Sequence, residues 1–563
     1  MRRRRVAVGV LALAALCFLA VDLTACGSSS SGGGGGGGSA NASPVSGGTL
    51  AVSFQGEPTG LDPALAWEVE SWSIEHCIFN QLLTWAPGTG PATLVPDLAT
   101  EVPTTENGGI TNGGKTYIFH LRKGVMFQAP VSREVTAEDV KYSFERMMNP
   151  KEVPLAPAGY LYDKVVGTED FVDGKAKEIT GFKVVDPYTI QIDLTTPNYV
   201  FNSVMAQPFT AVMAKEWVSK YNSRTIARHP LGTGPFVFDH WTNGQEIVLN
   251  RNPEYFDTGK PYLDAIDLKF AASASTAVLQ LQRGDIDVLG SNIPSADYVR
   301  LSNDPKWKKQ IFTAPQVAWF YVFMNVKVKP FDNVKVRQAI NYAIDTEKIQ
   351  KLQYGQAQAL NQIYPVGMPG HVDGAQFYTH DPAKAKQLLA EAGFPNGFSV
   401  TFSTHNVDPM PTLAQTIQND LAQVGIKASI KQMAESPYWN LINRMDANIP
   451  IGLTDWYMDY PDPSDWIAAL FSKDSAETDG SANASWWWNA EVEKLYQQSL
   501  PMEASAARTK LYQEMQQIIM DEAPTAPLFQ PIQTTMASAA TGGFYTSPIW
   551  TFDFPSYWKT DGQ

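Results

Sequence analysis

FSVTFSTHNVDPMPTLAQTIQNDLAQVGIKASIKQM, residues 398–433, places one helix-like segment between two strand-like segments. The middle of this stretch has apolar residues at helical spacing along one stripe, and the pattern stops at Gly425. The stripe consists of Leu413, Ile417, Leu421 and Val424. The segments 398–404 and 426–433 have strand character, so the order predicts a βαβ unit. Such a unit is typical of a parallel sheet covered by helices, which favours the α/β fold class.

Strand and helix signals alternate along the rest of the chain as well. We expect strands at 49–54 and 117–121 and a β-hairpin at 182–194. Thr136 and Asp139 form a capping-box pattern in front of an apolar helical face, which predicts the start of a helix. This alternation supports an α/β architecture over most of the chain.

Length and composition restrict the possible functions. A chain of 563 residues is too long for one compact core, so we expect two or three domains. Hydrophobic residues make up 44% of the chain, which is enough to build those cores. The formal net charge of −14 disfavours nucleic acid as a partner, because a phosphate-binding surface needs an excess of Lys and Arg.

The N-terminus has the three parts of an export signal. Arg2–Arg5 form a positive block, an apolar run follows over 6–21, and small residues precede Cys26. This order predicts a signal peptide at 1–25. A retained membrane helix is the alternative, but the apolar run is shorter than the roughly 20 residues that a bilayer span needs.

Leu23-Thr24-Ala25-Cys26 resembles the lipobox of bacterial lipoproteins, in which the cysteine is lipidated and becomes the new N-terminus. A diacylglyceryl group on Cys26 would supply the two acyl chains that stable anchoring requires. Residues 26–44 are rich in Gly and Ser and are expected to form a flexible tether. We therefore expect an extracytoplasmic protein, anchored to the outer face of the cell membrane by a lipid on Cys26. Both the Sec and the twin-arginine export routes are compatible with this segment.

The sequence gives no indication of a cofactor or of a metal site. Its cysteines are Cys17, Cys26 and Cys77, and this set builds no disulfide framework. The seven histidines are scattered, without a short pair at metal-ligand spacing. Gly232-Thr233-Gly234 lacks the Lys-Ser/Thr ending of a phosphate loop, so these glycines indicate a tight turn instead.

Short motifs follow one another in a characteristic order after the tether. They are Gly47-Gly48-Thr49-Leu50, Pro58-Thr59-Gly60-Leu61-Asp62-Pro63, Leu94-Val95-Pro96-Asp97-Leu98-Ala99, Phe119-His120-Leu121-Arg122-Lys123-Gly124-Val125, Val135–Val140, Gly232–Phe236, Arg251–Tyr255 and Val336–Asp345. Each motif alone is a weak signal, whereas their order and spacing together are specific. Through them the chain resembles family 5 of the bacterial extracellular solute-binding proteins, the dipeptide-, oligopeptide- and nickel-binding lipoproteins of ABC importers.

The resemblance implies a two-lobed clamshell of the periplasmic-binding-protein type II, with an extra α+β domain inserted in the first lobe. Carried onto this chain, lobe I takes 45–90, 215–315 and 525–563. The inserted domain takes 91–214, and lobe II takes 316–524. Closure of the lobes about a hinge of two crossing strands would give a transporter a conformational signal.

The resemblance also implies a ligand site. Trp456-Tyr457-Met458-Asp459-Tyr460 matches the W-x-x-D-Y motif of peptide-binding relatives, whose aspartate contacts the α-ammonium of the peptide. Asp459 would have this role, because a ligand ammonium in a closed, dry cleft needs a charged partner. Trp456 and Tyr460 would wall the pocket with aromatic contacts. The alternative is that Asp459 and Asp462 are turn residues beside prolines.

The other end of the ligand has no evident charged partner. Dipeptide-binding relatives often carry an arginine in the stretch that corresponds to 402–412, where this chain has neither Arg nor Lys. An oligopeptide is therefore favoured over a dipeptide. Nickel or another small solute carried by the same family is the alternative.

We expect a binding protein and not an enzyme. Neither G-x-S-x-G nor H-E-x-x-H occurs, although Asp459 and Asp462 could imitate a glycosidase pair, so a tethered extracellular hydrolase is the alternative of another class. A sensory lipoprotein with the same clamshell is a third hypothesis. The expected partners are a peptide, the permease subunits of an ABC transporter and the membrane through the lipid, and we expect a monomer.

Overall fold

The computed structural model describes residues 43–560 except 67, 90–91, 155, 157 and 548. The described residues belong to one compact unit. The signal peptide predicted at 1–25 and the anchor predicted at Cys26 lie outside the described residues, as does nearly all of the tether predicted at 26–44.

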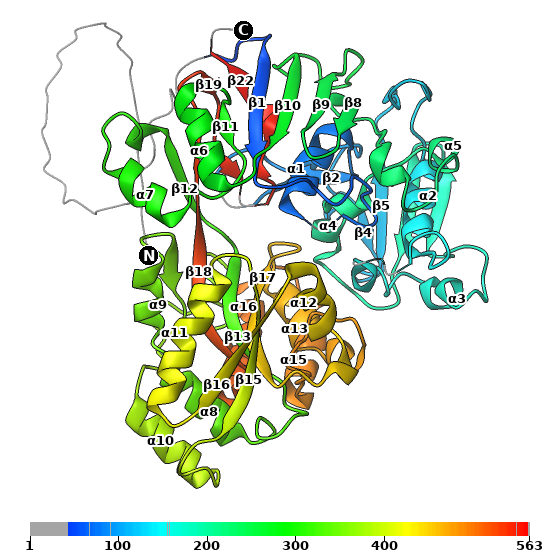
Figure 1. The fold of residues 1–563 in the computed structure, drawn as a ribbon. Coiled ribbons are helices and arrows are strands. Elements are labelled where there is room, and N and C mark those ends of the chain that lie inside the picture. Colours follow the sequence, from blue (N-terminus) through cyan, green and yellow to red (C-terminus); the bar gives the residue numbers. More distant parts are fainter. Residues whose placement is uncertain are drawn as a thin grey trace, which may run out of the picture. The chain divides into compact units, whose positions relative to one another are not determined.

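The βαβ unit predicted at 398–433 is confirmed. β15 (Ser399–His405) and β16 (Lys427–Met433) pair in parallel, and α11 (Met410–Gln423) connects them and covers one face of their sheet (Figure 1). All four residues of the predicted apolar stripe are buried. The helix forms here because its apolar side chains recur at helical spacing and can all reach one core.

In the structure, we use lobe II for the part of the molecule built on the largest sheet, which includes 311–315 and 525–536 in addition to strands within the predicted 316–524. The strand order in this sheet is β12-β18-β13-β17-β15-β16, and β14 pairs with β18. Its other strands are β12 (Ile311–Pro315), β13 (Ala318–Met324), β14 (Ala357–Ala359), β17 (Ile451–Tyr457) and β18 (Thr525–Met536). Its helices besides α11 are α8 (Val334–Ala343), α9 (Thr346–Leu352), α10 (Pro382–Glu391), α12 (Glu435–Ile442), α13 (Pro463–Leu470), α14 (Lys473–Glu477), α15 (Ala490–Ser499) and α16 (Ala506–Glu522).

Strand β13 shows why this sheet is the centre of lobe II. Its residues are apolar and buried throughout, and alternate side chains enter two different apolar clusters. A strand with a core on each face needs apolar residues at every position.

Lobe I is our name for the other part of the described chain, which has two larger sheets. One has the order β11-β1-β10-β9-β8 and the other β4-β5-β7-β6. The strands of lobe I are β1 (Thr49–Phe54), β2 (Leu83–Trp85), β3 (Leu94–Pro96), β4 (Ile110–Thr111), β5 (Thr116–His120), β6 (Phe182–Asp186), β7 (Thr189–Asp193), β8 (Phe236–Thr242), β9 (Glu246–Arg251), β10 (Ala265–Phe270), β11 (Val288–Leu289), β19 (Thr541–Gly542), β20 (Thr546–Ser547), β21 (Thr551–Phe552) and β22 (Trp558–Lys559). Its helices are α1 (Val69–Ile78), α2 (Ala137–Met148), α3 (Thr168–Val172), α4 (Phe201–Val204), α5 (Lys215–Val218), α6 (Ala274–Arg283) and α7 (Ser295–Ser302).

The elements predicted in the first part of the chain are confirmed. β1 and β5 occupy the predicted strand positions, and β6 and β7 pair antiparallel as the predicted hairpin. The capping box at Thr136 and Asp139 is present at the start of α2.

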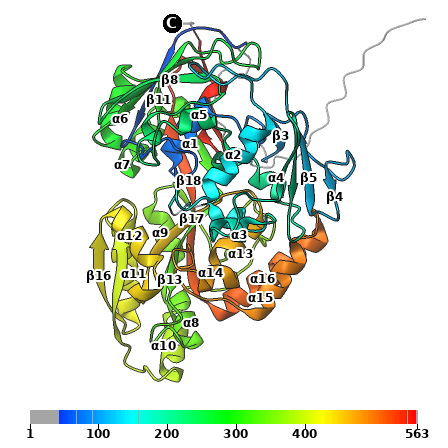
Figure 2. The same ribbon diagram turned by 90° about the vertical axis from the view of Figure 1, so that its right-hand side faces the viewer.

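Two paired strands, β12 and β18, lie next to each other where the chain passes between the lobes. β12 pairs antiparallel with the second half of β18, and β13 pairs with its first half. Beyond β18, Ala537 bridges to Val288 of lobe I. Figures 1 and 2 show β18 running from one lobe to the other. A paired crossing of this kind can bend without loss of the cores on either side, which makes it the natural hinge.

The glycines at 232 and 234 have a packing role. Neither has a positive φ angle, but a Cβ atom at Gly232 would lie 2.3 Å from the carbonyl oxygen of Ile78. A Cβ atom at Gly234 would lie 2.5 Å from the carbonyl carbon of the same residue. The end of α1 therefore packs directly on this segment, which only glycine permits.

Candidate ligand site between the lobes

The predicted site segment lies at the carboxyl end of a central strand of lobe II. β17 ends at Tyr457, and Asp462 caps the next helix, α13, by accepting a hydrogen bond from the backbone N–H of Ser464 at 2.9 Å. The carboxyl ends of strands in open α/β sheets are where ligands bind. The segment 458–461 is thus held at both ends by regular structure.

Asp459 is buried at a contact between the lobes. Its side chain is only 2% exposed, and its carboxylate accepts a hydrogen bond from the hydroxyl of Tyr160, which lies in a 3₁₀ turn of lobe I (Gly159–Leu161). The backbone N–H of Asp459 donates to Oδ2 of Asp465 at 3.2 Å. A carboxylate from one lobe therefore meets a hydrogen-bond donor from the other.

Trp456 packs in the core of lobe II directly beside this contact. It is 8% exposed and belongs to an apolar cluster with Trp319 and Trp466. Its indole Nε1 donates to Oδ2 of Asp465 at 2.9 Å. Burial, with the nearby charge of Asp459, raises the pKa of Asp465 well above its usual range. Asp465 thus supports both the aromatic ring and the backbone of the site segment.

Tyr460 crosses from lobe II into the core of lobe I. It is 4% exposed and belongs to the apolar cluster that contains Phe119 and Trp550 of lobe I. Its hydroxyl forms a hydrogen bond with Oγ of Ser464 at 3.1 Å.

The lobes also contact each other through the backbone. The backbone N–H of Tyr199 in lobe I donates to the carbonyl of Leu500 in lobe II at 3.1 Å. The two lobes are therefore in contact in this structure.

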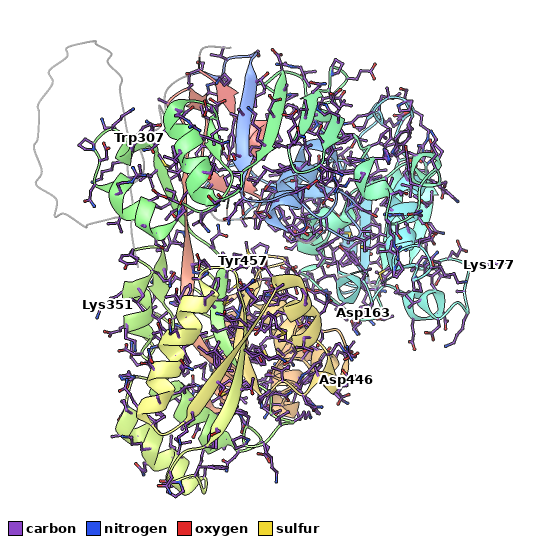
Figure 3. The ribbon with its side chains drawn as sticks, in the orientation of Figure 1. Asp163, Lys177, Trp307, Lys351, Asp446 and Tyr457 are labelled. Carbon is purple, nitrogen blue, oxygen red and sulfur yellow. The ribbon has the colours of Figure 1, made fainter. Side chains whose placement is uncertain are left out.

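Further side chains face the space between the lobes. Tyr457 is 41% exposed, and burial together with the charge of Asp455 raises the pKa of its hydroxyl. In Figure 3 it lies on the side of lobe II that is nearest lobe I. Burial and the charge of Glu435 raise the pKa of Asp455, two residues earlier on the same strand face, to about 7.

Sequence reasoning missed several of these residues. Asp455 and Tyr457 share a strand face, so strand alternation from the W-x-x-D-Y motif could have indicated them. Tyr160 comes from a distant short 3₁₀ turn, and nothing in its sequence surroundings distinguishes it. The sequence predicted a site segment at 456–460 but not the residues of the other lobe that contact it.

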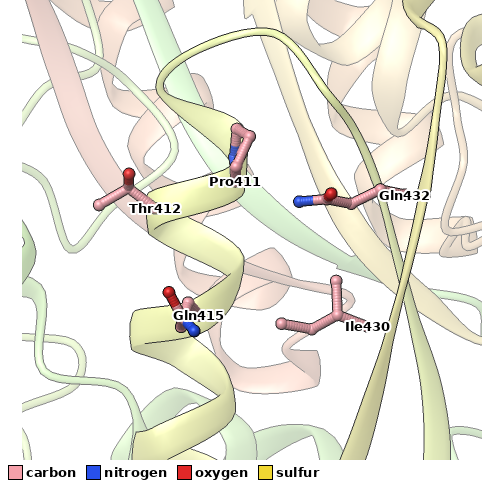
Figure 4. A pocket seen from close by; sticks show the side chains of 5 residues that line it. All are labelled: Pro411, Thr412, Gln415, Ile430 and Gln432. Carbon is pink, nitrogen blue, oxygen red and sulfur yellow. The ribbon is translucent and has the colours of Figure 1, made fainter.

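A hollow lies on lobe II, and none of the predicted site residues lines it. It is an open depression of about 420 Å³ between α11 and β16. Its lining consists of Pro411, Thr412, Gln415, Ile430 and Gln432 (Figure 4). No charged side chain lines it, so it offers no partner for a charged end of a ligand.

Within 43–560, with the gaps given above, no helix has the length and apolarity to cross a bilayer. In the same part of the chain, no three His, Cys, Asp or Glu side chains come together in a way that could hold a metal ion.

Comparison with known proteins gives one consistent family. Residues 93–478 match the model of the bacterial extracellular solute-binding proteins, family 5. The dipeptide-binding protein of Escherichia coli is 30% identical, over 87% of this chain and 92% of the relative. Heme-binding protein A of Haemophilus influenzae is 29% identical, over 87% of this chain and 89% of the relative.

Solved structures agree with these relatives. A periplasmic binding protein of Helicobacter pylori in complex with the peptide STSA superposes with a TM-score of 0.79 at 27% identity, over 92% of this chain and 99% of that one. The clavulanic acid biosynthesis oligopeptide binding protein 2 superposes with a TM-score of 0.84 at 24% identity, over 93% of this chain and 99% of that one, which concerns the fold alone.

Proposed function

The chain belongs to family 5 of the bacterial extracellular solute-binding proteins and has their two-lobed α/β clamshell fold, and from this premise we propose that it captures an oligopeptide between its lobes and delivers it to an ABC importer. Members of this family are extracytoplasmic binding proteins of transporters and not enzymes. The preference for an oligopeptide over a dipeptide rests on the lack of Arg and Lys at 402–412.

The observation that carries this proposal is the position of Asp459. Its carboxylate is 2% exposed and lies where lobe II meets Tyr160 of lobe I. A ligand ammonium in this position would gain a charge-assisted hydrogen bond in a place from which water is excluded. Trp456 and Tyr460, both buried beside it, would form the apolar wall of the pocket.

Asp459→Asn tests this role. Asparagine keeps the size and an acceptor oxygen for Tyr160 but removes the negative charge. We expect the affinity for a free-amine tetrapeptide to fall by roughly 30-fold or more, because a buried charge pair is lost. The affinity for the N-acetylated form of the same peptide should change by less than about threefold. Isothermal titration calorimetry measures both.

The matched control is Asp446→Asn, a change at an exposed aspartate on lobe II that pairs with Arg444 (Figure 3). It should leave both affinities unchanged. Equal losses for the free and the acetylated peptide in Asp459→Asn would remove Asp459 from the ammonium site.

We further propose that the protein is held at the membrane by a lipid on Cys26, after removal of residues 1–25. The lipobox-like Leu23–Cys26 and the tether behind it support this anchor. Cys26→Ala should leave the protein uncleaved or release it from the membrane, as measured by fractionation and mass spectrometry. Membrane retention of a cleaved chain in this variant would contradict the anchor.

A further inference from the structure

Strand β18 changes its partner along one edge at the point where it passes between the lobes. Up to Pro531 this edge pairs with β14 of lobe II, and the N–H of Ile532 donates to the backbone carbonyl of Gln356, just before β14, at 2.9 Å. Two residues later, the carbonyl of Thr534 accepts a hydrogen bond from the N–H of Ile293 of lobe I at 2.8 Å. The edge therefore passes from one lobe to the other within three residues, and a rotation of the lobes acts on this short stretch.

The side chain of Gln356 bridges this change of partner. Its Nε2 donates to the carbonyl of Ile293 at 2.7 Å and to Oγ1 of Thr534 at 2.5 Å. Its Oε1 accepts a hydrogen bond from Oγ of Ser295, the first residue of α7, at 2.7 Å. One terminal amide thus binds two residues of lobe I and the strand that joins the lobes, with its donor group and its acceptor both in use.

This contact lies apart from the contacts of the proposed peptide site. Gln356 follows α9, and Figure 1 shows α9 below α7 on the left of the molecule, where β12 also lies. The contacts of Tyr160 with Asp459 and of Tyr199 with Leu500 belong to the part of lobe I that contains α3, on the right of the same view. The lobes are therefore joined at two separate places, at Gln356 and at the proposed site.

We propose that Gln356 is a hinge clasp, by which we mean that its hydrogen bonds to Ile293, Ser295 and Thr534 hold the lobes in the closed arrangement. Opening of the lobes moves Ile293 and Ser295 relative to Gln356, because they belong to different lobes, so these hydrogen bonds stabilise the closed form. A ligand held between the lobes binds the closed form, and its apparent affinity falls in proportion to the closed fraction of the protein. This inference rests on the proposed peptide-binding function and adds a residue that sets the affinity without contact with the ligand.

Gln356→Ala should make the lobes separate more often, even without a ligand. The reporter is the backbone N–H of Tyr199, which donates to the carbonyl of Leu500 across the lobes. Hydrogen–deuterium exchange of the ligand-free full-length chain, measured by mass spectrometry, should show about fivefold faster exchange of this N–H, because hydrogen bonds that favour closure are lost. Ser295→Ala removes one of these hydrogen bonds, so it should speed the exchange by about threefold and add little to Gln356→Ala.

Peptide affinity provides a second measurement of the clasp. Gln356→Ala should weaken the binding of a free-amine tetrapeptide and of its N-acetylated form by the same factor, about fivefold, because the clasp acts on closure and not on the ammonium group. Asp459→Asn, by contrast, should distinguish between the two peptides. Isothermal titration calorimetry measures all four affinities.

Gln418→Ala is the matched control, because Nε2 of Gln418 donates to the carbonyl of Ala428 at 2.8 Å within lobe II. It should change neither the exchange at Tyr199 nor the affinities. Unchanged exchange at Tyr199 in Gln356→Ala and Ser295→Ala would show that the clasp does not hold the lobes together. A loss of affinity for the free-amine peptide alone would contradict an action through the hinge. If the parent binds no peptide, the proposed function fails, while exchange in the ligand-free chain still decides whether the clasp exists.

Discussion

Arg508→Ala should lower the free energy of unfolding by about 3–5 kcal/mol and weaken peptide binding as well. Arg508 binds Asp462 through two hydrogen bonds of 2.7 and 2.8 Å, and both side chains are largely buried. Its Nε also donates to the carbonyl of Ser499 at 3.2 Å. Removal of the guanidinium leaves a buried carboxylate without its partner. Urea unfolding of the variant and the parent measures the loss.

Peptide binding should suffer because Asp462 ends the site segment. Asp462 caps α13 and fixes the end of 458–461, so its displacement would also move Asp459. The comparison variant is Arg444→Ala, whose partner Asp446 is exposed, and which should cost less than about 1 kcal/mol. A similar small cost for Arg508→Ala would show that the Arg508 pair does not hold the segment in place.

The sequence was sufficient to predict elements whose signals are local. The βαβ unit at 398–433 follows from apolar spacing and a terminating glycine, and each feature is visible within a short window. The capping box at Thr136 and Asp139 is equally local. Such elements are predictable because the residues that determine them are neighbours along the chain.

The site was only partly predictable because its partners come from distant segments. The ligand role of Asp459 is a prediction from its motif, whereas its hydrogen-bond partner Tyr160 lies 299 positions away and contacts it only where the lobes meet. Tyr460 was expected in a pocket wall, and the structure adds that it enters the core of the other lobe. A local sequence pattern cannot predict a contact between residues that belong to the cores of two different lobes.

The Pro58–Pro63 motif also has a long-range contact that the sequence did not predict. In the sequence, this motif contributed only to the family resemblance. In the structure, its Asp62 accepts hydrogen bonds of 2.8 and 2.6 Å from Arg146 of α2. Both side chains are almost fully buried, with 3% of Arg146 and 1% of Asp62 exposed. The motif therefore ties the start of lobe I to α2.

Arg146→Met should consequently destabilise lobe I by about 3–5 kcal/mol, since it leaves the carboxylate of Asp62 buried and unpaired. The double variant Asp62→Leu with Arg146→Met should recover at least half of this loss, because two apolar side chains can fill the same space without an orphaned charge. Urea unfolding of both variants and the parent measures these differences. A double variant no more stable than Arg146→Met would mean that hydrogen-bond geometry, and not the unpaired charge, sets the cost. In that case the hydrogen bonds from Arg146 to Asp62 hold α2 in place, and an apolar pair cannot replace them.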